Sequence, residues 1–441
     1  MLTESQAYDL ANKILSYSKL PECQIFLWES EEAYVRFANN AITTSGFVER
    51  RTIAIQSTRD RKTGAVSLTE IDEPSLRAAV ARSEEMASLA SVNQEYVEPL
   101  GPQEYPKLNK FHEETAKARS PVMIPHIRAI IDGALKAKLN GAGFFTRSSG
   151  VSAVANKRGL FGFHASTNAS LSTTVRKPDG TSSGWASQPS PRISDIDGAA
   201  LAERAITKCL KWEKPKRLEP GKYAVVLEPA ATADLVGLLT SNFSAREADE
   251  GRSFLAKKGG GTYLGEKLFP EIITLRSDPF EPRLSSNPWS GDLLPNQRVT
   301  WIEKGVVKNL AYGRYWAAKK NKQPVPEGDS GVLEGGSGSI DDLIRTTERR
   351  LLVTRFWYIR EVNPQTLQLT GLTRDTVFLI ENGNVTTPVM NFRFNESPVR
   401  LLQNVQQLGQ PVPAEGAETS PTLAPPLRAT EFTFTSISDA V

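Results

Sequence analysis

Two strand-forming runs around residue 360 constrain the fold more than any other part of the chain. The first, residues 354–360, reads Thr-Arg-Phe-Trp-Tyr-Ile-Arg, and the second, residues 378–383, is apolar and ends in Asn-Gly. Between them lies a short run, Gly-Leu-Thr-Arg-Asp, that ends in Arg374 and Asp375. Aromatic and β-branched residues favour strands, and Asn-Gly favours a hairpin turn. We therefore predict paired strands in the C-terminal part of the chain.

The composition is that of an ordinary soluble globular protein. The chain has 441 residues, 39% of them hydrophobic and 23% charged, and this length predicts two or three domains. Eighteen apolar residues never run together, and the start shows no basic segment before an apolar core, so we expect neither a membrane span nor a secretion signal. The expected location is the cytoplasm.

The charged residues and cysteines argue against several kinds of partner and site. The net charge is +3, which does not indicate a nucleic-acid partner unless basic residues gather on one face. Cys23 and Cys209 are far apart in sequence and give no sign of a disulfide framework or a Cys-x-x-Cys metal site. We expect both to be buried thiols.

The first unit is predicted to span residues 1–97 and the second residues 111–212. In the first unit, Thr3 begins a helix with capping-box spacing, Asp72 precedes another, and strands are expected at 25–28, 33–37 and 51–57.

The second unit repeats this plan. Its first helix starts at Ser120 and is predicted to stop at Asn140-Gly141, with an apolar face of four residues, and a further helix over 195–212 closes the unit. The residues of that apolar face are Ile127, Ile130, Ile131 and Leu135.

The third domain is predicted to span residues 222–441 and to be mostly antiparallel β-structure. It opens with a strand over 223–227, and Pro229 begins a helix whose apolar face is Val236, Leu239 and Phe243. Overall we expect an α+β protein, with two small helix-plus-sheet units followed by a large β-rich C-terminal domain.

The strand runs and the helix after Pro229 together resemble the C-terminal half of the TldD/PmbA (TldD/TldE) family of metallopeptidase subunits. In metal-bearing members of that family the equivalent helix carries His-Glu-x-x-x-His, which supplies zinc ligands and a general base, and a cysteine near the C-terminus is a further ligand. Here the window 233–242 contains no histidine and no glutamate, and its one carboxylate is Asp234. No cysteine follows Cys209.

The resemblance therefore implies a TldE/PmbA-type subunit that binds no metal itself, because zinc requires three or four converging donors. It further implies a heterodimer with a TldD-type metallopeptidase subunit that holds the zinc. An unfolded peptide would lie as an added strand against a sheet edge, and the partner's zinc-activated water would cut it. No nucleic-acid or membrane partner is expected.

Two charged groups are candidates for binding a peptide or a partner. Asp249, Glu250 and Arg252 follow the helix that would hold metal, and they form either a solvated helix end or an intersubunit ion-pair network. Arg374 and Asp375 form either a salt-bridged turn that fixes strand register or a polar clamp on a peptide.

Two other functions stay open at this point. The chain could be a metallopeptidase active on its own, with Asp234, Asp249 and Glu250 as ligands, so its status as an enzyme is undecided. It could instead modulate DNA gyrase, for which a concentrated basic face would argue, but the basic clusters are short and scattered. His112-Glu113-Glu114 lacks the second histidine of a zinc helix.

Overall fold

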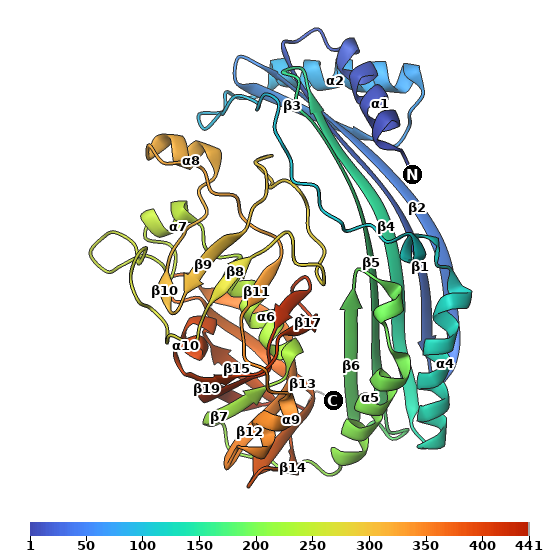
Figure 1. Ribbon diagram of the computed structural model, residues 1–441, viewed down its shortest axis with the longest axis vertical. Coiled ribbons are helices and arrows are strands. Elements are labelled where there is room, and N and C mark those ends of the chain that lie inside the picture. Colours follow the sequence, from blue (N-terminus) through green and yellow to red (C-terminus); the bar gives the residue numbers. More distant parts are fainter. Residues whose placement is uncertain (440–441) are drawn as a thin grey trace.

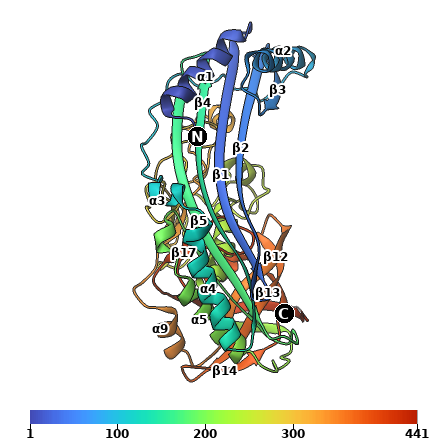
Figure 2. The same ribbon diagram turned by 90° about the vertical axis from the view of Figure 1, so that its right-hand side faces the viewer.

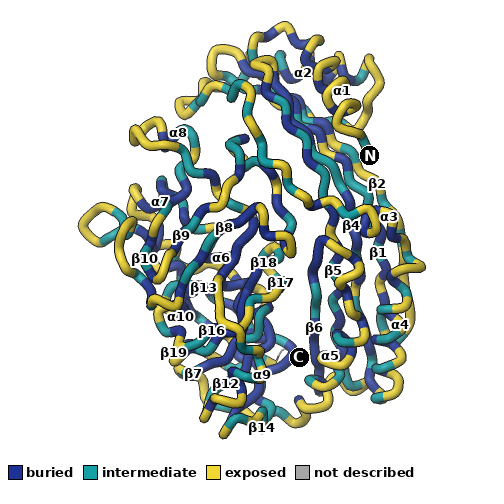
Figure 3. Tube along the Cα trace, in the orientation of Figure 1, coloured by how far each residue is buried: buried dark blue, intermediate teal, exposed yellow. Residues whose placement is uncertain are grey.

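The computed structural model describes residues 1–439, and its α+β architecture confirms the predicted fold class. A long curved sheet forms one side of the molecule, and a strand-rich C-terminal part lies against the lower half of its concave face (Figure 1). Buried residues are concentrated in the C-terminal strands and alternate with less buried residues along the long sheet (Figure 3).

The first unit begins with helices whose starts the sequence predicts correctly. The backbone N–H of Gln6 donates to Thr3 Oγ1 at 3.3 Å and the N–H of Thr3 donates to Gln6 Oε1 at 2.9 Å, which is a capping box. Asp72 caps the second helix by accepting from Ser75 N at 3.0 Å. The elements are α1 (Glu4–Tyr17), β1 (Glu22–Ala38), β2 (Ala41–Arg59), β3 (Lys62–Leu68) and α2 (Glu73–Leu89).

The second unit has the same plan, with a helix, a three-stranded meander and a closing helix. Its closing helix buries Leu201, Ala205 and Cys209, which are spaced four residues apart along one face. The elements are α3 (Glu113–Lys117), α4 (Ser120–Lys136), β4 (Asn140–Asn156), β5 (Phe161–Arg176), β6 (Ser183–Ser190), η1 (Ile193–Asp195) and α5 (Gly198–Lys211).

Three local predictions in these units are wrong. Leu135 is 56% exposed and does not belong to the buried face. Residues four apart are offset by about 40° around a helix, so in the series Ile127, Ile131, Leu135 the third residue has already turned away from the core. The helix ends at Lys136 and not at residue 140, because Asn140 already pairs with Arg176 at the start of β4. The strands predicted at 25–28 and 33–37 are one continuous strand, β1.

The two units share a single sheet in the order β3-β2-β1-β4-β5-β6. Its centre is the antiparallel pair β1–β4, which runs from Gln24 opposite Asn156 to Phe37 opposite Gly143. Helices α4 and α5 pack on the face away from the C-terminal part, and α1 and α2 cover the opposite end of the sheet (Figure 2). The two meanders are therefore joined edge to edge.

The C-terminal domain contains a ring of strands around an aromatic core. Strand β12 pairs with both β7 and β13, so the order β12-β7-β19-β15-β13 closes on itself. Phe356, Phe394 and Phe432 are fully buried at its centre, with ring centroids 4.8–5.4 Å apart. Burial of such aromatic side chains is a major source of core stability.

Most pairings in this domain are antiparallel, as predicted, and β12–β7 and β11–β18 are parallel. The strands are β7 (Gly221–Leu227), β8 (Leu275–Ser277), β9 (Val299–Glu303), β10 (Val306–Val307), β11 (Gly331–Leu333), β12 (Arg349–Asn363), β13 (Gln368–Glu381), β14 (Asn384–Val389), β15 (Phe392–Glu396), β16 (Val405–Leu408), β17 (Val412–Ala414), β18 (Thr422–Ala424) and β19 (Leu427–Ile437). The helices are α6 (Pro229–Thr240), α7 (Ala245–Asp249), α8 (Arg314–Lys319), α9 (Ile340–Arg345) and α10 (Pro398–Gln403).

The segment between α2 and α3 connects the long sheet to the C-terminal domain. It has no helix or strand, and Tyr105 Oη donates to Leu293 O at 2.9 Å. Lys110 Nζ donates to Glu281 O at 2.5 Å and to Leu284 O at 2.8 Å. Within residues 1–439, none of the helices combines the length and the apolar character that crossing a bilayer requires.

Candidate functional site

Helix α6 is the centre of the candidate site. Pro229 occupies its first turn, and apolar side chains on most of its surface bury it between β12 and the strands β11, β17 and β18. Asp234 is fully buried in the middle of this apolar helix. A buried carboxylate requires hydrogen-bond donors, and those donors define the site.

The donors come from the loop between β17 and β18, residues 415–421, which we call the β17–β18 loop. Asp234 Oδ2 accepts from Ala417 N at 3.0 Å, and Oδ1 accepts from Glu418 N at 3.0 Å. Thr419 Oγ1 lies 3.4 Å from both Asp234 Oδ1 and Ala233 O. The loop is thereby fixed on the face of α6.

Two glycines allow this close contact. A Cβ atom on Gly416 would lie 2.1 Å from Asp234 Cγ, and a Cβ atom on Gly237 would lie 2.8 Å from Thr419 Cβ. Both distances are too short for non-bonded carbon atoms. Glycine at both positions lets the loop backbone rest directly on the helix. No space for even one additional carbon atom is left between the loop and α6 at these two positions.

The same loop also occupies the edge of β12. Strand β12 pairs with β7 only from Leu351 to Val353, so its later residues have no strand on that side among the described residues. Glu418 Oε1 accepts from Ile359 N at 3.0 Å, and Glu418 Oε2 lies 3.2 Å from Arg360 Nη1. The Glu418 carboxylate thus binds the backbone N–H of Ile359, which a strand added at this edge would otherwise bind.

A zinc ion does not fit at this place on α6. Zinc needs several imidazole, thiolate or carboxylate donors directed at one point, and here one carboxylate is already bound by two backbone N–H groups. Burial raises the pKa of Asp234 to about 6, while the N–H groups of Ala417 and Glu418 oppose that rise. Among residues 1–439, no cluster of three or more His, Cys, Asp or Glu side chains could hold a metal ion.

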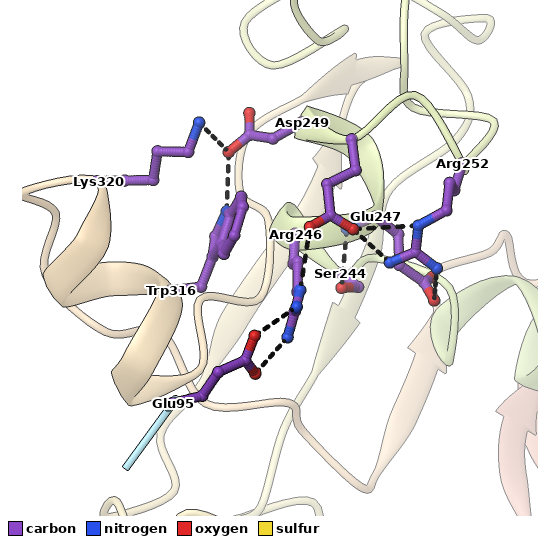
Figure 4. A network of polar contacts seen from close by, with 9 residues as sticks. Glu95, Ser244, Arg246, Glu247, Asp249, Arg252, Trp316 and Lys320 are labelled. Atoms are coloured by element: carbon purple, nitrogen blue, oxygen red, sulfur yellow. Dashed lines mark hydrogen bonds and ion pairs between the residues drawn. The ribbon is translucent and has the colours of Figure 1, made fainter. Parts of the chain in front are cut away.

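The predicted group at 249–252 lies in an ion-pair network within the chain (Figure 4). Glu250 binds Arg246 at 3.2 Å and Arg252 at 2.5 Å, and Arg246 in turn makes a bidentate contact with Glu95 at 2.7 and 2.8 Å. Asp249 Oδ2 accepts from the Trp316 indole at 2.8 Å and lies 3.4 Å from Lys320 Nζ. Because Glu95 belongs to the segment after α2, the network connects that segment to α7 and α8.

Arg374 and Asp375 do not form a turn, which corrects the sequence interpretation. Both lie inside β13, where Asp375 has a φ of +66° next to an irregularity in the β12–β13 register. Asp375 is fully buried and accepts from Arg355 Nε at 2.6 Å. Arg374 is half-buried, with its guanidinium 5.0 Å from the Trp357 ring, and burial lowers its pKa.

The Arg355–Asp375 ion pair lies where the long sheet meets the C-terminal domain. The Arg355 guanidinium packs 4.5 Å from the Trp185 ring of β6, and Ser183 Oγ donates to Asp375 O at 3.3 Å. The cation that pairs with Asp375 is thus Arg355 and not the neighbouring Arg374, and the contacts of this pair connect β6 to β12 and β13.

Sequence reasoning missed Glu415, Gly416 and Glu418. They lie in a polar loop between two three-residue strands, and nothing in their own sequence places them against α6. The buried Asp234 was the available signal, because a carboxylate in an apolar helix implies that donors arrive from elsewhere in the fold.

Three segments of the chain match family profiles. Residues 23–87 match "PmbA/TldA metallopeptidase domain 1", residues 98–211 the "PmbA/TldA metallopeptidase central domain", and residues 220–436 the "PmbA/TldA metallopeptidase C-terminal domain". The sequence matches no curated protein.

Several solved structures have the same fold. TldE from Thermococcus kodakarensis superposes with a TM-score of 0.84 at 20% identity, covering 97% of this chain and 99% of that one. A putative modulator of DNA gyrase from Thermotoga maritima has a TM-score of 0.83 at 17% identity, covering 97% and 100%. Another such putative modulator, from Bacteroides thetaiotaomicron, has a TM-score of 0.83 at 19% identity, covering 99% and 100%. At these identities the likeness concerns the fold.

Proposed function

The chain belongs to the PmbA/TldA metallopeptidase family, and on that premise we propose that it is a non-catalytic, TldE/PmbA-type subunit of a peptidase complex. In this proposal a TldD-type partner subunit holds the zinc and cuts unfolded peptides in the cytoplasm. This chain shapes the peptide-binding space and positions the substrate.

The observation that carries the proposal is the β17–β18 loop on α6. A catalytic metal needs ligands and an open position for water beside the helix. In this chain Gly416 rests against Asp234, and the N–H groups of Ala417 and Glu418 take up the carboxylate. The space that a metal and its water would need is filled by backbone.

The three carboxylates considered for a self-sufficient metallopeptidase are engaged separately. Asp234 binds the β17–β18 loop, Asp249 binds Trp316 and Lys320, and Glu250 binds Arg246 and Arg252. Asp234 lies on α6, whereas Asp249 and Glu250 are neighbours at the end of α7 that bind different cations. This arrangement favours an accessory role over independent catalysis.

In each basic cluster considered for a gyrase modulator, one side chain is paired with a carboxylate. Lys257 contacts Glu266, Lys320 lies 3.4 Å from Asp249, and Arg349 lies 3.9 Å from Glu381. A nucleic-acid partner is usually bound by a continuous basic face. We therefore give the peptidase role priority.

The proposal is tested by combining the chain with a TldD-type protein from the same source. Each protein alone and the two together are incubated with casein-derived peptides, and cleavage products are identified by mass spectrometry. We expect no cleavage by this chain, and a changed rate or pattern of cleavage by the partner when this chain is added. Zinc, measured by elemental analysis, should follow the partner only.

The opposite result is equally clear. Cleavage by this chain alone that a chelator abolishes, together with stoichiometric zinc in the purified chain, would falsify the accessory role. Failure to co-purify with the partner and to change its cleavage would remove the complex from the proposal.

A further inference from the structure

A polar cavity lies where the inner face of the long sheet meets the C-terminal domain. Its volume is about 520 Å³, within the range of small-ligand sites, and strands β4, β5 and β6 form one wall. The β17–β18 loop and two segments of the C-terminal domain, residues 283–287 and Asp329, form the other wall.

Hydroxyl and amide groups dominate the lining. The sheet contributes side chains such as Ser148, Ser166 and Asn168, and the C-terminal domain contributes others such as Ser285 and Asn287. An apolar ligand would gain little in such a cavity, because its entry would desolvate polar groups without replacing their hydrogen bonds. A peptide backbone, with alternating donors and acceptors, can replace them.

Two carboxylates in the lining have neutral partners only. Glu415 Oε2 accepts from Ser170 Oγ at 2.8 Å, and burial raises the pKa of Glu415. Asp329 Oδ1 accepts from Ser286 Oγ at 2.5 Å, and Oδ2 accepts from Asn287 N at 2.8 Å. These hydroxyl and amide donors orient the carboxylates without neutralising their charge.

The guanidinium in the lining does not compensate them. Arg283 Nε lies 2.7 Å from Glu281 Oε1, so its charge is balanced by a carboxylate outside the lining. Lys110 Nζ, buried behind residues 281–284, partly offsets the charge of Asp329, but the lining itself keeps an excess of negative charge that is centred on Glu415. In a partly enclosed site such an excess favours a cationic ligand more strongly than it would at an open surface.

We propose that this cavity binds an extended polar peptide segment and recognises a cationic group on it, an ammonium or a guanidinium, through Glu415 and Asp329. The inference rests on the proposed function and adds a preference: a peptide held by this chain has a lysine or arginine side chain, or a free α-amino group, at this position. The hydroxyl and amide groups of the lining would bind the peptide backbone on both sides of that cationic residue.

The test measures direct binding of short fluorescent peptides to this chain alone, by anisotropy at low ionic strength. The peptides alternate Gly and Ser and have one central residue, which is Lys, norleucine or Glu, with an acetylated N-terminus. A fourth peptide has central norleucine and a free N-terminus, so that a side-chain cation and an α-amino group are distinguished. We expect the Lys peptide to bind about tenfold more tightly than its norleucine counterpart, a value between those of exposed and buried ion pairs.

Variants assign the preference to the cavity. Glu415→Gln keeps an acceptor for Ser170 and should remove most of the tenfold preference, whereas Glu415→Lys should reverse it in favour of the Glu peptide. A reversal cannot result from misfolding. Glu104→Gln, at an exposed position outside the cavity lining, is the matched control and should leave all affinities unchanged.

Equal binding of the Lys, norleucine and Glu peptides would overturn the inference, as would a Lys preference that survives in Glu415→Lys. Because the partner subunit is absent from this assay, the result is separate from that of the cleavage test. A chain that changes the partner's cleavage without preferring cations would retain the proposed function and lose only this inference.

Discussion

Gly416→Ala should release the β17–β18 loop from α6. The new Cβ would lie 2.1 Å from Asp234 Cγ and 2.2–2.3 Å from its two oxygens, and Asp234 is itself fully buried in α6. Overpacking of this kind costs about 1–3 kcal/mol. Displacement of the loop would also leave the carboxylate without its N–H donors, at a cost of about 1–3 kcal/mol. We expect the free energy of unfolding to fall by roughly 2–6 kcal/mol.

Urea denaturation measures this loss, and hydrogen exchange at Ala417 and Glu418 reports whether the loop has left the helix. Gly101→Ala is the matched control, because a Cβ there would meet no atom within 4 Å. The double variant Asp234→Ala/Gly416→Ala removes the clashing side chain. It should therefore be more stable than the sum of the single variants predicts, by about 1–3 kcal/mol. Unchanged stability in Gly416→Ala, or additivity in the double variant, would refute the reasoning.

Three further results are expected. Burial raises the pKa of Asp234 to about 6, above its value in the unfolded chain, so the stabilisation from its protonated form is lost as pH rises from about 4 to 6. In urea titrations at a series of pH values, the free energy of unfolding of the wild type should therefore fall by roughly 2–3 kcal/mol relative to that of Asp234→Asn over that window. Arg355→Met leaves the fully buried Asp375 without its cation and should cost about 3–5 kcal/mol in thermal unfolding. Arg246→Ala, in a largely exposed network with Glu95, should cost no more than about 1 kcal/mol, and the loss should shrink in concentrated salt.

Each of these results has a contradicting outcome. Parallel pH profiles for the wild type and Asp234→Asn would mean that this carboxylate titrates normally. An Arg355→Met variant as stable as the wild type would mean that the Arg355–Asp375 pair does not stabilise the fold. A salt-independent loss in Arg246→Ala would assign its effect to packing against Trp316 instead of charge.

The helix starts and the strand content could be read from the sequence because their causes are local. Thr3 and Asp72 cap helices through residues three positions away, and Asn382-Gly383 supplies the two positive φ angles of a tight hairpin. The absence of histidine and glutamate from α6 can likewise be read from the sequence, because it depends only on which residues are present. The resemblance to a family followed from these runs.

Other features depend on contacts between distant residues. Nothing local indicates that β1 pairs with β4, which joins two units into one sheet. Nor does anything local indicate that Arg374 and Asp375 lie within β13, or that Asp375 pairs with Arg355, which packs on Trp185 of the second unit. Leu135 was misplaced because a repeat of four residues drifts around a helix over several turns.

The sequence by itself determined that α6 has no zinc-binding motif, because ligand chemistry is a property of residue type. The tertiary structure alone decided what occupies the space beside that helix. Asp234 and Gly416 are separated by most of the C-terminal domain in sequence, and they meet because a buried carboxylate needs donors and a glycine lets backbone N–H groups approach closely enough to supply them.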